Sequence, residues 1–321
     1  MTFADLVAAS LLSPPVLCFV LGAVAVLLRS DLRLPEPVFQ ALSVYLLLAI
    51  GLKGGVDLSQ ARLSSVALPA LAALGLGVAI PVWIYQVLRR LAGFAVADAA
   101  AIAAHYGSVS AVTFIAVLGY LDATGTAYEG FMTALLAIME VPAIVVALIL
   151  ARWSGAGGQG LGAALGEVIS GKSILLLTGG MAIGYLAGPE GMAPVKPFFV
   201  DLFRGALCLF LLELGVVAAQ RARDVRAAGP MLIAVALGAP VLHAMAGLLI
   251  AFLVGLSMGG AIVLATLAAS ASYIAAPAAV RIGLPEANPG YYLGASLGVT
   301  FPFNVIVGIP LYAAAARLLY A

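Results

Sequence analysis

The stretch Gly107-Ser-Val-Ser-Ala-Val-Thr113 decides the fold, because it is small and polar inside a long apolar run, residues 95–120. A second stretch, Ser270-Ala-Ser-Tyr-Ile-Ala-Ala-Pro277, interrupts another apolar run, residues 256–283. Both stretches contain the pattern Ser-x-Ser. Inside a membrane the backbone leaves the helical state only where it borders protein or a watery cavity. Two matched interruptions therefore indicate a transport site near the middle of the bilayer.

The composition is that of a membrane protein. Hydrophobic residues make up 64% of the 321 residues, charged residues only 9%, and the mean hydropathy is +1.18. A soluble domain carries about a quarter charged residues. The net charge of +1 argues against a nucleic-acid partner, and Cys18 and Cys208 lie in apolar runs, which argues against a disulfide framework. We therefore predict an all-α polytopic membrane protein.

Ten apolar segments have the length of about 17–25 residues that a hydrocarbon core requires. No basic residue precedes the first, so it is expected to be a retained span and not a cleaved signal peptide. The predicted spans are residues 8–28, 37–53, 66–88, 95–120, 128–151, 172–188, 197–219, 230–254, 257–282 and 290–319.

The two halves of the chain resemble each other. Ser110 precedes Pro142 by 32 residues, and Ser272 precedes Pro302 by 30, so the halves map onto each other with an offset of about 160 residues. Because five spans are an odd number, the halves would enter the membrane in opposite directions, as an inverted repeat whose site lies at the repeat interface. The alternative is that two apolar halves look alike through composition alone.

This repeat defines the predicted organisation. Residues 1–151 would form the first five-helix repeat, residues 152–171 a Gly-rich, flexible cytoplasmic linker, and residues 172–321 the second, inverted repeat. The two broken helices would face each other near the midplane.

Lysine and arginine residues divide unequally between the two predicted faces, ten against five. The richer face is expected to be cytoplasmic, which places both termini outside. The richer face holds Arg29, Arg33, Arg89, Arg90, Arg152, Lys172, Arg221, Arg223, Arg226 and Arg281, and the other holds Lys53, Arg62, Lys196, Arg204 and Arg317.

The two breaks offer the chemistry of an anion site. A broken helix exposes the free N–H groups and positive dipole end of the half-helix that follows, which bind anions without a fixed cation. Serine hydroxyls add donors, and Pro277 frees a carbonyl by removing one. The predicted anion-binding residues are Gly107, Ser108, Ser110, Ser270 and Ser272. The alternative is that small residues simply let helices pack closely.

Glu140 is the second feature, because it lies in the middle of a span and precedes Pro142. An ionisable group at that depth is a functional hypothesis by default. It could ligate Na⁺ or carry a proton, with Thr113, Thr300 and Asn304 as further oxygen ligands of the coupling ion. A structural carboxylate is the alternative.

Three other polar residues in the spans have less specific interpretations. Glu213 is open to the same two readings as Glu140. His243 is interpreted as a core histidine, and Lys53 is expected to extend its ammonium to the membrane interface.

The sequence contains no catalytic constellation: no metal-spaced His/Cys set, no P-loop and no nucleophile motif with a plausible triad. A transporter is therefore favoured over an enzyme and over a nucleotide-driven pump, and no cofactor is expected beyond a coupling ion. A channel stays possible, although paired half-helices with a mid-span carboxylate favour a closed site.

At these residues the chain resembles the sodium-dependent bicarbonate transporters of the cyanobacterial SbtA type and their wider bacterial relatives. The matching stretches, in order, are Ile50-Gly-Leu-Lys-Gly-Gly55, Gly107–Thr113, Met139-Glu-Val-Pro-Ala143, Leu202-Phe-Arg-Gly205, Ala268-Ala-Ser-Ala-Ser272, Pro277, Arg281-Ile-Gly-Leu-Pro285, Ala287-Asn-Pro289 and Gly308-Ile-Pro310. The resemblance implies ten spans in a 5+5 inverted repeat, core and gate subdomains, a trimer in the bacterial inner membrane, and Na⁺-coupled anion uptake where the two broken helices cross.

The chain also departs from this family at the breaks. Tyr273 stands where the family has an acid, Ala111 stands where it has Gly, and both are expected, with Pro277, to shape the pocket. The loop between the halves is shorter than in the cyanobacterial proteins, so binding of their PII-like regulator is not expected. The leading hypothesis is Na⁺-coupled uptake of bicarbonate or a similar small anion. The alternative is a proton-coupled or exporting carrier of a small organic anion.

Overall fold

A computed structural model describes residues 12–156, 160–226 and 229–321. These residues form helices and no strands, which confirms the all-α prediction. The α-helices are α2 (Pro14–Leu27), α3 (Glu36–Gln60), α4 (Leu63–Arg90), α5 (Val96–Gly107), α6 (Ala111–Thr124), α7 (Met132–Glu140), α8 (Pro142–Trp153), α9 (Leu161–Ile169), α10 (Lys172–Met192), α11 (Phe203–Arg226), α12 (Pro230–Leu253), α13 (Met258–Ala269), α14 (Ala275–Gly283), α15 (Pro289–Leu293), α16 (Phe301–Phe303) and α17 (Ile309–Leu319). One 3₁₀ turn, η1 (Ala193–Val195), and three π-helical segments, η2 (Pro197–Asp201), η3 (Gly294–Thr300) and η4 (Asn304–Gly308), join some of them.

Seven helical stretches in the described chain are long and apolar enough to cross a membrane, and a bent pair, residues 162–169 with 172–195, could supply an eighth. The seven are Glu36–Gln60, Ser64–Arg90, Val96–Thr124, Met132–Trp153, Phe203–Arg221, Pro230–Leu253 and Pro289–Leu319. These seven stretches account for seven of the ten predicted spans, and the bent pair overlaps an eighth, residues 172–188.

The two remaining predicted spans appear as shorter apolar helices. Helix α2 covers residues 14–27 of the first, and residues 8–11 lie outside the described part of the chain. Helix α13 covers only residues 258–269 of the ninth, because it ends where the second break begins.

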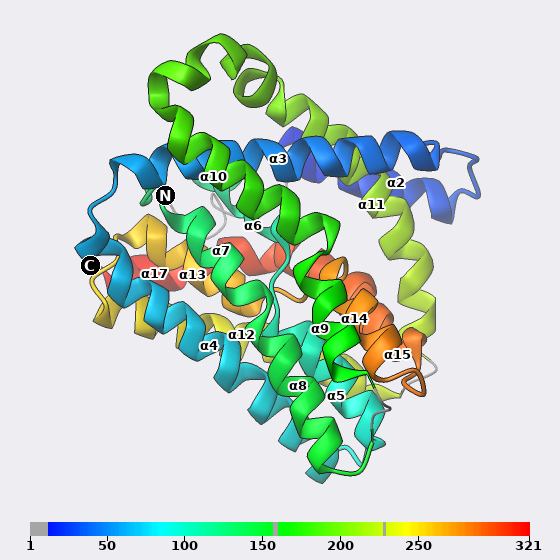
Figure 1. Ribbon diagram of the computed structural model, residues 1–321. Helices are drawn as coiled ribbons and strands as arrows, with labels where there is room; N and C mark the ends of the chain where they lie inside the picture. Colours follow the sequence, from blue (N-terminus) through cyan, green and yellow to red (C-terminus); the bar gives the residue numbers. More distant parts are fainter. Residues whose placement is uncertain (1–11, 157–159, 227–228) are drawn as a thin grey trace.

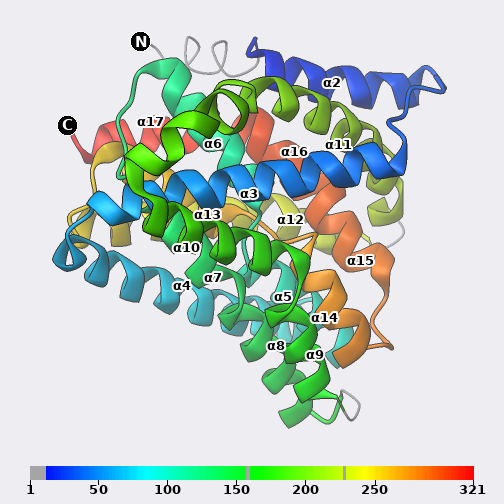
Figure 2. The same ribbon diagram turned by 45° about the horizontal axis from the view of Figure 1, so that its top comes forward.

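Helices α2, α3, α10 and α11 lie together along one side of the molecule (Figures 1 and 2), and we call them the layer. Within the layer α3 packs along α10, and α2 packs along α11. The first half of the chain therefore contacts the second in both pairs.

Glycines bring these paired helices to backbone contact. A Cβ atom added at Gly55 of α3 would lie 2.1 Å from the Met181 carbonyl oxygen of α10, and one at Gly184 of α10 would lie 2.0 Å from the Leu52 carbonyl oxygen. Between α2 and α11, a Cβ atom at Gly22 would lie 1.9 Å from the carbonyl oxygen of Leu212. Such close approach is the usual means of helix association in membranes, where the hydrophobic effect does not drive it.

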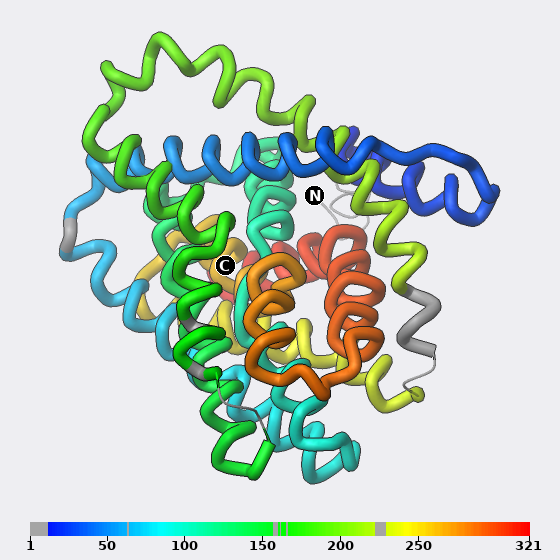
Figure 3. Tube along the Cα trace, turned by 45° about the vertical axis from the view of Figure 1, so that its right-hand side comes forward, coloured from blue at the N-terminus to red at the C-terminus, as the bar shows by residue number. Residues whose placement is uncertain are grey.

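The remaining helices, α4–α9 and α12–α17, form what we call the bundle, which lies beneath the layer (Figure 3). In the first half α4 packs against α5 and α8, and in the second half α12 packs against α13 and α17. The layer contacts the bundle through α3 with α7 and through α11 with η3.

The segment predicted to be a flexible linker contains helix α9 instead. Ala164 and Val168, four residues apart and therefore on one helix face, are buried, and α9 packs against α14. The chain then bends by 47° into α10. Residues 157–159 of the predicted linker lie outside the described residues.

Candidate functional site

The first break lies between α5 and α6. Helix α5 ends at Gly107, the backbone is extended at Ser108 and Ser110, and α6 begins at Ala111. The Ser110 hydroxyl accepts a hydrogen bond of 3.1 Å from the Thr113 amide and so caps α6. The predicted interruption of this span is confirmed.

The second break has the same construction. Helix α13 ends at Ala269, the backbone is extended at Ser270, and α14 begins at Ala275. The Ser272 hydroxyl accepts a hydrogen bond of 3.2 Å from the Ala276 amide, in the first turn of α14. In each break the second serine of the Ser-x-Ser pattern therefore binds the N-terminus of the following half-helix.

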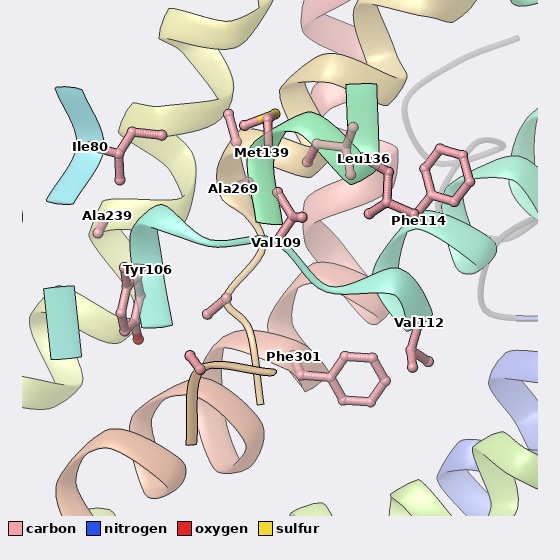
Figure 4. Packing of buried hydrophobic residues seen from close by; sticks show 14 of the residues in the cluster. Ile80, Tyr106, Val109, Val112, Phe114, Leu136, Met139, Ala239, Ala269 and Phe301 are labelled. Carbon is pink, nitrogen blue, oxygen red and sulfur yellow. The ribbon is translucent and has the colours of Figure 1, made fainter. Parts of the chain in front are cut away.

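The two breaks cross and bind each other. The Ser110 amide donates a hydrogen bond of 3.0 Å to the Ser270 hydroxyl, and the Ser272 amide donates one of 2.8 Å to the His105 carbonyl oxygen. Figure 4 shows the extended segment that carries Val109 passing the chain that follows Ala269. The crossing thus provides acceptors for the backbone amides of both breaks. Such acceptors are needed because backbone N–H groups inside a membrane must be hydrogen-bonded.

A small cavity lies beside this crossing, between the layer and the bundle. Ala111 and Val112, the first two residues of α6, line it, and their amides have no hydrogen-bond partner among the described residues. Ser43 of α3 lines it from the layer, and its hydroxyl has no partner in the described part of the chain either. These are donors that an anion could use.

The cavity is very small. Its volume of about 10 Å³ is about the minimum that one water molecule needs. Its walls belong to both parts of the fold: Ser43, Leu46, Leu47 and Phe210 come from the layer, and Ala111, Val112, Ile115 and Ile274 from the bundle. Any larger guest therefore requires the layer and the bundle to separate here.

Glu140 is attached to the first break through its backbone. Its carbonyl oxygen accepts a hydrogen bond of 2.8 Å from the Ser108 hydroxyl. The Glu140 side chain is buried at the end of α7, and within the described residues its carboxylate makes no hydrogen bond. A buried carboxylate without a partner in a membrane span calls for a counter-ion or a proton.

Thr300 and Asn304 are engaged in structural hydrogen bonds. The Thr300 hydroxyl donates to the Ala236 carbonyl oxygen at 2.7 Å and lies 2.6 Å from the Tyr106 hydroxyl. The Asn304 amide donates to the Ala269 carbonyl oxygen at 2.9 Å, and its oxygen accepts from Tyr312 at 2.7 Å. Asn304 thus holds the last carbonyl of α13, and Thr300 lies beside the end of α5.

Gly107 and Pro277, two further predicted site residues, have different structural roles. Gly107 is a packing position, because a Cβ atom there would lie 2.5 Å from the Cδ atom of Pro81 and 2.8 Å from the Cβ atom of Ala143. Pro277 is buried in the first turn of α14, where a missing N–H removes no helical hydrogen bond.

Tyr273 lies in the second break. Its ring meets Phe301 edge-on with centroids 5.3 Å apart. Its hydroxyl is buried near Ser110 but makes no hydrogen bond in the described part of the protein.

Sequence reasoning missed Ser43 and a larger cavity at the other end of α6. The only sequence signal for Ser43 is a serine among apolar neighbours on α3, which is weaker than the signal from the two matched breaks.

The larger cavity has a volume of about 320 Å³ and is lined by charged residues of both parts, Lys53 and Arg204 from the layer and Asp122 from the bundle. Lys53, whose ammonium is expected to extend to the membrane interface, lines this cavity.

The polar side chains of this cavity form a chain of contacts. The Lys53 ammonium donates to the Tyr128 hydroxyl at 3.3 Å, that hydroxyl donates to Asp122 at 3.5 Å, and Arg204 lies 3.3 Å from the other Asp122 oxygen. Burial raises the pKa of the Tyr128 phenol, so the group that links Lys53 to Asp122 is the neutral phenol.

The family model described as the Na⁺-dependent bicarbonate transporter superfamily matches residues 14–317, nearly the whole chain. A search of curated proteins gave no match.

Proposed function

The chain belongs to the Na⁺-dependent bicarbonate transporter superfamily, and from that premise we propose that it couples the uptake of bicarbonate, or of a similar small anion, to Na⁺. The family is one of transporters, so the protein is a multi-pass membrane transporter and not an enzyme. The substrate and the coupling ion of this particular chain belong to the proposal.

The crossing of the two breaks is the observation that carries the proposal. The amides of Ala111 and Val112 at the N-terminus of α6 have no hydrogen-bond partner among the described residues, and both residues line a cavity that Ser43 lines from the layer. Amides and hydroxyls at a helix N-terminus suit a small anion, because they stabilise negative charge without a fixed cation. Among the serines of the breaks, Ser110 and Ser272 would hold the two half-helix ends in place, and Ser108 and Ser270 would tie them to their neighbours.

Glu140 is the proposed Na⁺ ligand. Its carboxylate is buried without a hydrogen bond among the described residues, and its carbonyl is tied to the first break by Ser108. A hard cation prefers oxygen ligands, and broken helices in transporters commonly supply them. Thr113, whose amide binds Ser110, stays a proposed neighbour of the ion, whereas the existing hydrogen bonds of Thr300 and Asn304 favour a supporting role.

We also propose that the helices form a 5+5 inverted repeat. Support comes from helix contacts that correspond in the two halves. In the layer α3 packs on α10 as α11 packs on α2, and in the bundle α4 packs on α5 as α12 packs on α13. Transport would then proceed by movement of the bundle against the layer around the crossing. Assembly as a trimer in the bacterial inner membrane is part of the same proposal.

The direct test is uptake of radiolabelled bicarbonate into proteoliposomes with an inward Na⁺ gradient, with K⁺ in place of Na⁺ as control. We expect saturable uptake only with Na⁺. The bicarbonate assignment fails if uptake equals that of protein-free liposomes under both conditions.

Tyr273 favours a second candidate, a proton-coupled or exporting carrier of a small organic anion. Its buried hydroxyl has no partner among the described residues and lies close to Ser110, so it is available for a hydrogen bond to the carboxylate of an organic anion. External acidification without Na⁺ separates the two: proton-driven uptake of a carboxylate such as acetate supports this candidate and contradicts Na⁺ coupling.

A further inference from the structure

The cavity of about 320 Å³ lies between the layer and the bundle at the end of α6 that is remote from the crossing. Its layer side comes from α3 and α11 together with η2, which directly precedes α11, and its bundle side comes from α6, α7 and the segment between them. It is therefore built at the same interface as the small cavity beside the crossing.

Helix α6 connects the two cavities. Ala111 and Val112 at its N-terminus line the small cavity, Leu118 and Asp122 line the large one, and Ile115 lines both. From Ala111 to Asp122 the helix rises about 16 Å. The apolar side chain of Ile115 is thus the element of α6 that separates the two spaces.

Lys53 gives the large cavity a cation that is available to a guest. Its ammonium has three N–H donors and one hydrogen bond, 3.3 Å long, to the Tyr128 hydroxyl. The Asp122 carboxylate is paired with Arg204, and in the described part of the chain no carboxylate oxygen lies within 4.0 Å of the Lys53 nitrogen. Asp57, one turn along α3, and Asp201 of η2 are the other carboxylates that line the cavity.

We propose that this cavity is an entry vestibule in which Lys53 binds the incoming anion, a small oxyanion or monocarboxylate, and that Ile115 closes the path from the vestibule to the crossing. An ionisable residue inside a span that lines a cavity commonly marks an ion or substrate path. The proposal rests on the proposed transport of an anion, but it requires neither bicarbonate nor Na⁺.

The local electrostatic potential tests the proposal without a transport measurement. In a variant with Cys18→Ser and Cys208→Ser, the substitution Leu118→Cys places one thiol on the vestibule wall. Its rates of reaction with an anionic sulfonate and a cationic trimethylammonium methanethiosulfonate give a rate ratio that reports the potential at that wall.

We expect Lys53→Gln to lower the anionic-to-cationic rate ratio by about threefold or more, because it removes one charge from a partly dehydrated space. Lys53→Arg should keep the ratio. Lys196→Gln is the matched control, because Lys196 is an exposed lysine that does not line the cavity. Should Leu118→Cys express poorly, Ala49→Cys provides the thiol on the opposite wall.

Two results would overturn the proposal. A thiol that reacts with neither reagent shows that the vestibule is not open to solution, and a ratio that Lys53→Gln leaves unchanged shows that Lys53 does not set its potential. In uptake assays Lys53→Gln should raise the KM for the anion with little effect on kcat. Failure of bicarbonate uptake with an intact rate-ratio effect would contradict the proposed substrate and not the vestibule.

Discussion

Ser110 makes two separate hydrogen bonds, one through its side chain and one through its backbone. Its hydroxyl caps α6, and its amide binds Ser270 of the other break. Ser272 repeats the arrangement, with its hydroxyl on the Ala276 amide and its own amide on the His105 carbonyl oxygen. The serine side chains hold the half-helix ends, while the amides of Ala111 and Val112 are left for a ligand.

Ser110→Ala and Ser272→Ala are expected to abolish uptake while the protein still folds. Each removes a hydrogen bond to the first turn of a half-helix, which costs about 1 kcal/mol and lets the half-helix end move. Uptake in proteoliposomes and expression level measure the two effects, with the exposed Ser65→Ala as control. Near-normal uptake in both variants would show that these serines serve packing only.

Tyr273→Phe separates substrate contact from structure. Because the Tyr273 hydroxyl has no hydrogen-bond partner among the described residues, its removal should leave the melting temperature in detergent unchanged or slightly higher. We expect altered competition between bicarbonate and small carboxylates in uptake assays. Unchanged competition, with Tyr185→Phe at an exposed site as control, would exclude Tyr273 from anion selection.

Glu140→Gln is expected to lower Na⁺-driven uptake by more than about tenfold, because the amide cannot balance a cation at that depth. Glu140→Asp should retain part of the activity, and the exposed Glu190→Gln should retain all of it. Uptake measured against Na⁺ concentration checks this. Full Na⁺ dependence in Glu140→Gln would assign the coupling ion elsewhere.

At the scale of elements, the sequence predicted what local chemistry determines. The breaks after Gly107 and Ala269 were predictable because Ser-x-Ser is a poor continuation of an apolar helix, and the structure has both. That the breaks hydrogen-bond to each other was not predictable from spacing, since it depends on how the two halves meet. The roles of Thr300 and Asn304 were obscured for the same reason: their partners, Ala236 and Ala269, are remote in sequence.

Helix α9 shows a second reason why prediction from the sequence falls short. Its segment is rich in glycine, which indicates a flexible connection, but the buried face formed by Ala164 and Val168 packs against α14. Tertiary packing therefore overrides a weak helix propensity. The same packing attaches α9 to the bundle, directly before the bend of 47° into α10 of the layer.

The glycine contacts within the layer are open to a matched test. Gly55→Ala places a methyl group 2.1 Å from the Met181 carbonyl oxygen, so α3 and α10 must separate, at a cost of about 1–3 kcal/mol. Gly179→Ala on α10 meets no atom within 4 Å and should be neutral. Melting temperatures in detergent measure both, and equal values for the two variants would contradict close packing of α3 on α10.

At the scale of the whole molecule, two cavities at the same interface differ in volume by more than an order of magnitude, about 320 Å³ against about 10 Å³. The space between the layer and the bundle is thus larger at the Lys53 end of α6 than at the crossing. Movement of the bundle against the layer would change both cavities together, because each has walls from both parts.

The orientation of the molecule is a further prediction, based on the ten-to-five division of Lys and Arg. In the Cys18→Ser, Cys208→Ser variant, a thiol at Ala127 should react with a membrane-impermeant maleimide in intact cells. A thiol at Leu91, exposed beside Arg90, should react only after the membrane is permeabilised. The reverse pattern would invert the assigned direction of the vestibule.

The hydrogen bond from Ser110 to Ser270 joins residues that are 160 positions apart, which has a consequence for biosynthesis. At about 5–20 residues per second, a ribosome needs roughly 8 to 32 seconds to add that length of chain. During this interval the broken helix of the first half lacks its partner, the second break. The translocation machinery or water must satisfy that exposed backbone until the second break arrives, so the crossing is completed only after most of the chain has been synthesised.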